Sequence, residues 1–135
     1  EKGIWGDRRV SGEARRFAPE RKVFRNSLGM LAGFCGPNSF CNRALMKFRD
    51  VETTLQDLAD TSDGLVLTPA GVIYELWGGQ VSRRKCFACH GSGFAEAEAF
   101  LAGAGKCDEK TVKRALAHVA KVRCDCGDGV YGLKR

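Results

Sequence analysis

The sequence predicts an α+β fold in which short helices accompany one β-hairpin. Two apolar runs, residues 65–68 and 71–77, flank Pro69-Ala70. Proline suits the second position of a tight turn and glycine suits the fourth, so these runs are expected to pair as a hairpin. The apolar residues of 108–123 recur instead at i, i+3, i+4 and i+7, which is the period of an amphipathic helix. The two patterns together indicate a domain that mixes helices with a small antiparallel sheet.

Four helices are expected along the chain. The last of them begins after Asp108, which is a suitable N-cap, and spans about four turns. Shorter apolar patterns predict helices over 39–48, after Asp50 and over 95–101. Residues 28–36 are apolar as well, but three glycines interrupt them, so this pattern leaves helix and strand open.

The distribution of charge separates a basic arm from the rest of the chain. The length of 135 residues suits one small domain, placed at 27–135, preceded by an extended arm at 1–26. Residues 1–25 carry eight Lys or Arg and four Asp or Glu, within a net charge of +6 for the chain. Such an arm suits an acidic surface of a larger protein complex, a membrane-associated assembly or nucleic acid, and a solvated tail is the alternative. The residues expected to contact a partner are Trp5, Arg8, Arg9, Arg15, Arg16, Arg21 and Lys22.

The seven cysteines are grouped rather than spread along the chain. An odd number excludes a fully paired disulfide framework within one chain. Cys35 and Cys41 form a loose pair that is either a disulfide across a short loop or two buried thiols. Cys107 stands alone, and the other four form two close pairs far apart in the sequence, which is the spacing typical of metal sites.

Those two close pairs predict a zinc site with the ligands Cys86, Cys89, Cys124 and Cys126. A structural zinc ion takes four thiolate or imidazole ligands in a tetrahedron. Glycines after the second cysteine let the chain fold back around the ion, and the helix of 108–123 would return the second pair to the first. The C-terminal half, residues 86–131, is therefore expected to be a zinc knuckle.

The same residues allow two other interpretations. Cys86-x-x-Cys89-His90 is also the attachment pattern of a c-type haem, with His90 as the proximal ligand and His118 as a possible second one. A haem would leave the second cysteine pair without a role. A redox dithiol is the third interpretation, but the pair lacks the strand-to-helix setting of thioredoxin.

The stretch CFACHGSG, which begins at Cys86, resembles the Cys-x-x-Cys-x-Gly-x-Gly repeat of DnaJ-type zinc fingers. It is also similar to the zinc motif of lambdoid antitermination Q proteins. The second stretch, CDCGDGVYG, departs from the repeat by one residue between its cysteines. The chain has no His-Pro-Asp signature of a J-domain, so the resemblance implies a finger alone, like that of small plastid proteins that serve photosynthetic complexes.

No pattern in the sequence indicates catalysis. The expected function is therefore a non-catalytic zinc-finger interaction module, an accessory subunit or assembly factor that docks on a larger organellar complex. The alternatives are a nucleic-acid-binding zinc-finger protein and a small c-type cytochrome. The basic arm, the start at Glu1 rather than Met and the plastid resemblance predict import into an organelle, a plastid before a mitochondrion. No apolar run approaches the roughly 20 residues needed to span a bilayer.

Overall fold

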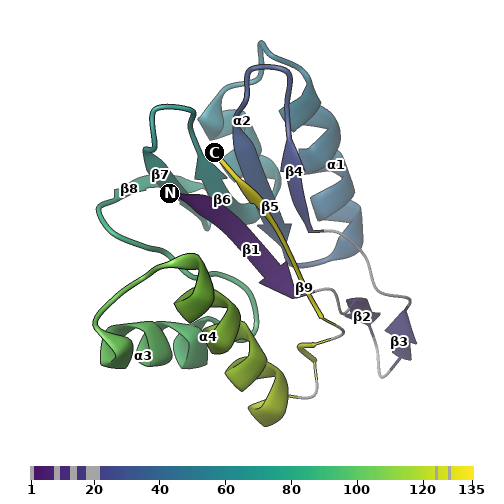
Figure 1. The fold of residues 1–135 in the computed structure, drawn as a ribbon. Coiled ribbons are helices and arrows are strands. Elements are labelled where there is room, and N and C mark those ends of the chain that lie inside the picture. Colours follow the sequence, from purple (N-terminus) through teal and green to yellow (C-terminus); the bar gives the residue numbers. More distant parts are fainter. Residues whose placement is uncertain (1, 8–9, 13–14, 18–21, 124, 128) are drawn as a thin grey trace.

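The computed structural model describes residues 2–7, 10–12, 15–17, 22–123, 125–127 and 129–135 of the chain. Figure 1 shows the arrangement of its helices and strands. In chain order the elements are β1 (Gly3–Asp7), β2 (Val10–Gly12), β3 (Arg15–Phe17), β4 (Val23–Arg25), β5 (Leu31–Cys35), α1 (Asn38–Arg49), α2 (Leu55–Thr61), β6 (Asp63–Leu67), β7 (Ile73–Trp77), β8 (Gln80–Arg84), α3 (Phe94–Ala104), α4 (Glu109–Val122) and β9 (Val130–Lys134).

The strands form one five-stranded sheet and two short ribbons. The large sheet has the strand order β4-β5-β6-β7-β8, and each pair of adjacent strands is antiparallel. β2 pairs with β3, and β1 pairs with β9 so that Gly3 lies opposite Lys134. The described parts of the two chain ends are therefore next to each other, as Figure 1 shows.

The outer face of the large sheet is covered by α1 and α2. Alternate residues of its strands, including Ala32, Phe34 and Val66, point to that side because successive side chains of a strand face opposite ways. They pack against Ala44 and Phe48 of α1 and against α2, and the rings of Phe34 and Phe48 meet edge to face. Burial of these apolar side chains holds the helical layer on the sheet.

The inner face of the large sheet is partly covered by the β1–β9 ribbon. Ile4 of β1 is buried together with Val23, Leu31 and Leu67 of the sheet, and Leu133 of β9 packs against this cluster. The helix α4 lies against β1 and β9 from the other side, and α3 packs on α4. The layers therefore follow in this order: the helices α1 and α2, the large sheet, the β1–β9 ribbon, and the helices α3 and α4.

Several local predictions are confirmed by the structure. The hairpin is formed by β6 and β7, with Leu67 opposite Ile73, and α4 begins directly after its N-cap Asp108. Helices α1 and α3 cover the segments predicted at 39–48 and 95–101. The ambiguous segment 28–36 contains the central strand β5.

One helix begins later than predicted. α2 is capped by Thr54, not Asp50, because the Thr54 hydroxyl accepts the N–H of Asp57 while the Asp57 carboxylate accepts the N–H of Thr54. This reciprocal pair satisfies two backbone donors at once, which a lone aspartate cannot do.

The expected α+β class is right, but the zinc-knuckle C-terminal half is wrong. Residues 86–93 connect the edge strand β8 to α3, and α3, α4 and β9 fill the rest of that half. The arm predicted at 1–26 also contributes to the layers, since β1 pairs with β9 and β4 joins the large sheet. Periodicity could not reveal the pairing of β1 with β9 because these strands are distant in sequence, and β4, with three residues, is too short to show a period.

Candidate functional site

A cavity of about 580 Å³ on the inner face of the large sheet is the candidate site. Its walls come from β1, β4 and β5, from the loop of residues 86–93, and from α3 and α4. Apolar side chains such as Leu65 and Ile73 line it together with a few polar groups. A mainly apolar cavity with a small number of convergent polar groups is the usual form of a ligand site.

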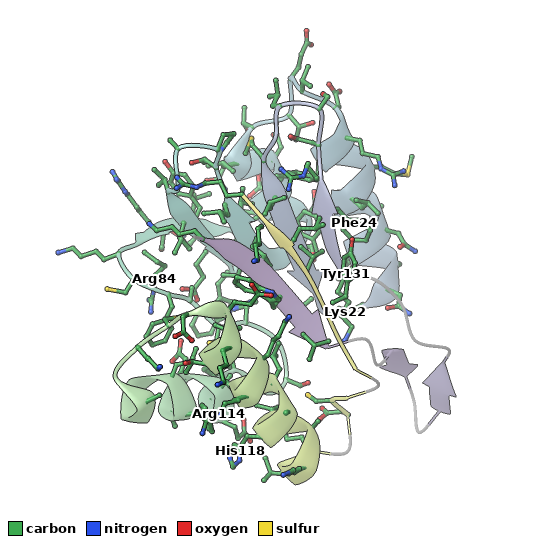
Figure 2. The ribbon with its side chains drawn as sticks, in the orientation of Figure 1. Lys22, Phe24, Arg84, Arg114, His118 and Tyr131 are labelled. Carbon is green, nitrogen blue, oxygen red and sulfur yellow. The ribbon has the colours of Figure 1, made fainter. Side chains whose placement is uncertain are left out.

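One polar group of this cavity is the ammonium of Lys22, which lies where β4 begins (Figure 2). Lys22 is near the thiols of Cys35 and Cys41, and its positive charge lowers the pKa of both. Burial outweighs this charge and, with further contributions from Asp63 and Cys41, raises the pKa of Cys35 to about 12. Burial also raises the pKa of Cys41. Both thiols are therefore protonated at neutral pH and are weak nucleophiles.

The turn Gly91-Ser92-Gly93 forms another wall of the cavity. Gly91 has a φ of 103°, and its carbonyl accepts the N–H of Phe94 at 3.2 Å where α3 begins. A Cβ added to Gly93 would lie less than 3.0 Å from Val119 and 3.3 Å from the Cys126 sulfur. The two glycines thus let the turn approach α4, and they place the Ser92 Oγ 3.6 Å from the Cys126 Sγ.

A charged network holds the other side of this turn. The guanidinium of Arg123 donates to both carboxylate oxygens of Asp125, at 3.0 and 3.1 Å, and to Glu96 at 3.3 Å. Hydrogen bonds from Arg123 and, to a smaller extent, Ser92 lower the pKa of Asp125 to about 2. Asp125 is therefore an ionised hydrogen-bond acceptor for Ser92 and a weak base.

The surroundings of Lys22 and Ser92 offer electrostatic stabilisation rather than a nucleophile paired with an effective base. The positive charge of Lys22 and the amino-terminal end of α3, which is the positive end of the helix dipole, both favour negative charge nearby. Among the described contacts of Ser92, the possible acceptors of its proton are the weakly basic Asp125 and the Cys126 sulfur, and the thiols of Cys35 and Cys41 are held protonated. The arrangement can therefore bind a polar group that gains negative charge.

The threonines of the chain lie elsewhere. All five are among the described residues, and none of them lines the cavity. Thr54 and Thr111 hydrogen-bond at the starts of α2 and α4. Thr61 donates to the Asp57 carbonyl, and Thr68 accepts the N–H of Val72. The threonines named here therefore hold local turns and helix starts and do not contribute to the cavity.

The predicted zinc ligands are only partly described, because Cys124 lies outside the described residues. Cys86 is exposed, Cys89 is half-buried and Cys126 is buried in a small core with Ala97 and Val119. Among the residues that the structure describes, no group of three or more His, Cys, Asp or Glu could hold a metal ion. The glycines after Cys89 serve the turn and its close approach to α4, so the knuckle is wrong, while zinc binding by the four thiols stays a prediction.

The histidines do not support the haem interpretation. The two ring nitrogens of His90 face Glu75 and Asp63, at 3.7 and 3.9 Å. His118 lies on α4 with its ring 5.5 Å from that of Phe100, and Figure 2 shows it on the helix. The carboxylates already occupy both edges of the imidazole that would have to bind the iron.

Two of the residues predicted to contact a partner have described side chains. The indole of Trp5 lies across the β1–β9 ribbon on Gly132, where an added Cβ would clash with it. Lys22 lines the cavity. Arg8, Arg9 and Arg21 lie outside the described residues, as do the side chains of Arg15 and Arg16.

The sequence analysis missed that Lys22, Cys35 and Ser92 belong to one cavity. A Gly-Ser-Gly turn that leads into a helix was the available signal for Ser92, but it was assigned to the zinc motif. No local signal connects Lys22 with Ser92, because only the stacking of the layers brings their segments to the same cavity.

Comparisons with known proteins identify the fold. A scan against protein-family models and a search of curated proteins both give no match. Among solved structures, the chain is similar to Thiobacillus denitrificans BPH in complex with epoxomicin, with a TM-score of 0.80 and 13% identity over 97% of this chain and 90% of that one. BPH alone gives a TM-score of 0.79 and 14% identity over the same shares. Eukaryotic HslV from Trypanosoma brucei gives 0.75 and 18% identity, over 97% of this chain and 91% of its own.

These neighbours are HslV-like and proteasome-like peptidases, and such proteins form larger oligomeric complexes. The resemblance to DnaJ-type fingers, plastid finger proteins and antitermination proteins is therefore wrong. The expectations of a non-catalytic module, a photosystem factor, a nucleic-acid-binding finger and a cytochrome are wrong for the same reason. At 13 to 18% identity the likeness establishes the fold, and the chain has the layered α+β fold of HslV-like peptidases.

Proposed function

We propose that this chain is a peptidase subunit that acts within a larger assembly of the HslV or proteasome type. The observation that carries the proposal is the match of the whole layered fold, over 97% of the chain, to peptidases of this type. The cavity between the layers is where a peptide would bind. No described helix is long and apolar enough to cross a membrane.

The polar groups of the cavity suit the hydrolysis of an amide. When a nucleophile attacks a peptide carbonyl, negative charge develops on the carbonyl oxygen. The Lys22 ammonium and the N–H groups at the start of α3 favour that charge, and Ser92 can hydrogen-bond a polar group of the reacting centre. These residues would stabilise the transition state rather than perform the attack.

The described threonines, Ser92 and the thiols of Cys35 and Cys41 do not supply the nucleophile of this reaction. The HslV-like neighbours are threonine peptidases, and none of the five threonines here lines the cavity. Ser92 is not activated, because its acceptor Asp125 is a weak base. We propose that another residue, from this chain or from a neighbouring subunit, completes the site.

Cleavage of fluorogenic peptides by the complete natural protein, purified in its assembled state, tests the proposal. Epoxomicin, which is bound in one BPH structure, serves as the active-site probe. We expect cleavage that epoxomicin blocks, and a fall in kcat/KM of about 100-fold in Lys22→Met, since the loss of one group that stabilises developing charge typically costs that much. The matched control is Lys121→Met, because Lys121 is exposed on α4 away from the cavity.

Two outcomes would contradict the proposal. One is an assembled natural protein that cleaves no peptide in a broad library and does not bind epoxomicin. The other is cleavage that Lys22→Met and Lys121→Met reduce equally. The assembly itself is checked by light scattering on the purified protein, which should give a mass several times that of one chain.

Two further expectations from the sequence stay predictions. The described residues do not address location in an organelle, which cell fractionation would test. They also leave open the division into an arm at 1–26 and a domain at 27–135, although β1 and β4 already belong to the layers.

A further inference from the structure

His90 is the last side chain before the Gly91-Ser92-Gly93 turn, and its ring is enclosed. The side chain is only 12% exposed. Its Nδ1 lies 3.7 Å from Glu75 Oε1, and its Nε2 lies 3.9 Å from Asp63 Oδ2. Trp77 meets the imidazole edge to face, with the ring centroids 6.0 Å apart. One imidazole thus stands between two carboxylates that come from different strands.

The two carboxylates are themselves fixed on the large sheet. Glu75 is in β7, its side chain is 13% exposed, and its Oε2 lies 3.4 Å from the guanidinium of Arg84 in β8. Asp63 begins β6, and its Oδ1 accepts the N–H of Gly78 at 3.0 Å. Because the sheet holds both partners, the imidazole between them connects the loop of residues 86–93 to the sheet.

Histidine is suited to this position by its shape. Its two nitrogens lie on opposite edges of one flat ring, so each can face a different carboxylate. Phenylalanine has the ring without the nitrogens, and glutamine carries donors at one end only. The distances of 3.7 and 3.9 Å are longer than those of hydrogen bonds, so the tie is a pair of polar contacts of the ring edges with two carboxylates.

We propose that His90 is the positioning residue that holds the Gly91-Ser92-Gly93 turn, and with it Ser92, against the large sheet. The role of Ser92 in this inference rests on the proposed peptidase function. On its other side the turn is held by Cys126 and Asp125. His90 therefore fixes the one side of the turn that faces β6 and β7.

Loss of the tie should affect turnover more than peptide binding. His90 determines the position of Ser92, and a displacement of about 1 Å at a reacting centre can lower the rate by up to about 100-fold. The apolar walls of the cavity, such as Leu65 and Ile73, would be unchanged. We therefore expect kcat to fall about 10-fold to 100-fold with KM within about twofold of the natural value.

The experiment compares His90→Phe with His90→Gln in the complete natural protein. His90→Phe keeps a ring of similar size and removes both nitrogens, whereas His90→Gln restores one donor and should recover part of kcat. The matched control is His118→Phe, because His118 is exposed on α4 and should leave kcat unchanged.

A second readout does not depend on activity. Cys89 precedes His90 and is half-buried, so its alkylation by iodoacetamide, followed by mass spectrometry, reports how firmly the loop is held. We expect His90→Phe to accelerate this alkylation about 10-fold or more, and His118→Phe to leave it unchanged. If His90→Phe does not fold, Asp63→Asn with Glu75→Gln removes both charges at nearly constant volume and should give the same two effects.

The outcomes separate this inference from the proposed function. A natural protein without peptidase activity would reject the peptidase proposal, and the Cys89 rate alone would then decide whether His90 holds the turn. An unchanged Cys89 rate in His90→Phe would overturn the inference in either case. In an active protein, so would faster alkylation without a fall in kcat, because the turn would then move without affecting the reaction.

Discussion

Gly93 is a position at which the candidate site tolerates little change. It is the N-cap of α3, and its φ of −99° and ψ of 18° are open to any residue, so alanine would not strain the backbone. The obstacle is space, because the new Cβ would lie less than 3.0 Å from Val119 Cγ1 and 3.3 Å from Cys126 Sγ. Val119 is 3% exposed and Cys126 is 8% exposed, so neither side chain can move into solvent.

The expected cost of Gly93→Ala follows from this geometry. Forcing a methyl group into a packed core costs about 1–3 kcal/mol. Alanine is also a poorer N-cap than glycine, which adds up to about 1 kcal/mol. We therefore expect the free energy of unfolding to fall by about 1–4 kcal/mol, which in a domain of this size lowers the melting temperature by about 4 °C for each kcal/mol.

Urea unfolding followed by circular dichroism measures this change in the free energy of unfolding. Two further variants serve as controls for the packing argument. Gly103→Ala lies in the same helix with nothing within 4 Å of the new Cβ, so it should stabilise the protein by up to about 1 kcal/mol. Val119→Ala removes the clashing methyl group, so its combination with Gly93→Ala should be less destabilised than the sum of the single variants by at least about 1 kcal/mol. Strictly additive effects, or a Gly93→Ala that unfolds like the natural protein, would refute the packing argument.

Three further predictions concern other parts of the chain. Gly132→Ala should displace the Trp5 indole from the β1–β9 ribbon, seen as a red-shifted emission of Trp5 in a Trp77→Phe background, and an unchanged spectrum would contradict the described contact. Hydrogen bonds from Thr111 lower the pKa of Asp108 from 3.8 to about 2, so the charge of Asp108 stabilises the fold above about pH 4, and this contribution is lost as the pH falls toward 2. Asp108→Asn, which keeps a capping side chain, should therefore melt lower than the natural protein at pH 7 and equally near pH 2, while a gap that persists at pH 2 would count against this assignment. Elemental analysis checks the zinc prediction, since one zinc per chain released by a thiol-modifying reagent would confirm it and a trace amount would reject it.

The cysteine motif shows how a local pattern can be assigned to the wrong structure. Cys86, Cys89 and the glycines at 91 and 93 have the spacing of a zinc knuckle. Tight turns at metal sites and tight turns at helix starts both need glycine, so the spacing alone does not distinguish them. In the folded chain these glycines serve the start of α3, where Val119 of α4 approaches Gly93.

The sequence by itself determined the elements whose signals are local. The N-cap Asp108 and the apolar period after it predict α4, and Pro69 with Gly71 predicts the turn between β6 and β7. Each of these depends on residues within a few positions of one another, where propensity and hydrogen bonding act directly.

Only the tertiary structure decided the layers and the site. The pairing of β1 with β9 joins the two ends of the described chain, and the cavity brings Lys22 and Ser92 together across 70 residues of sequence. Such contacts form because apolar faces are buried between layers, and many different partners could bury the same face equally well. The hydrophobic pattern therefore predicts that a face of a helix or strand is buried. Only the tertiary structure shows which segment buries it.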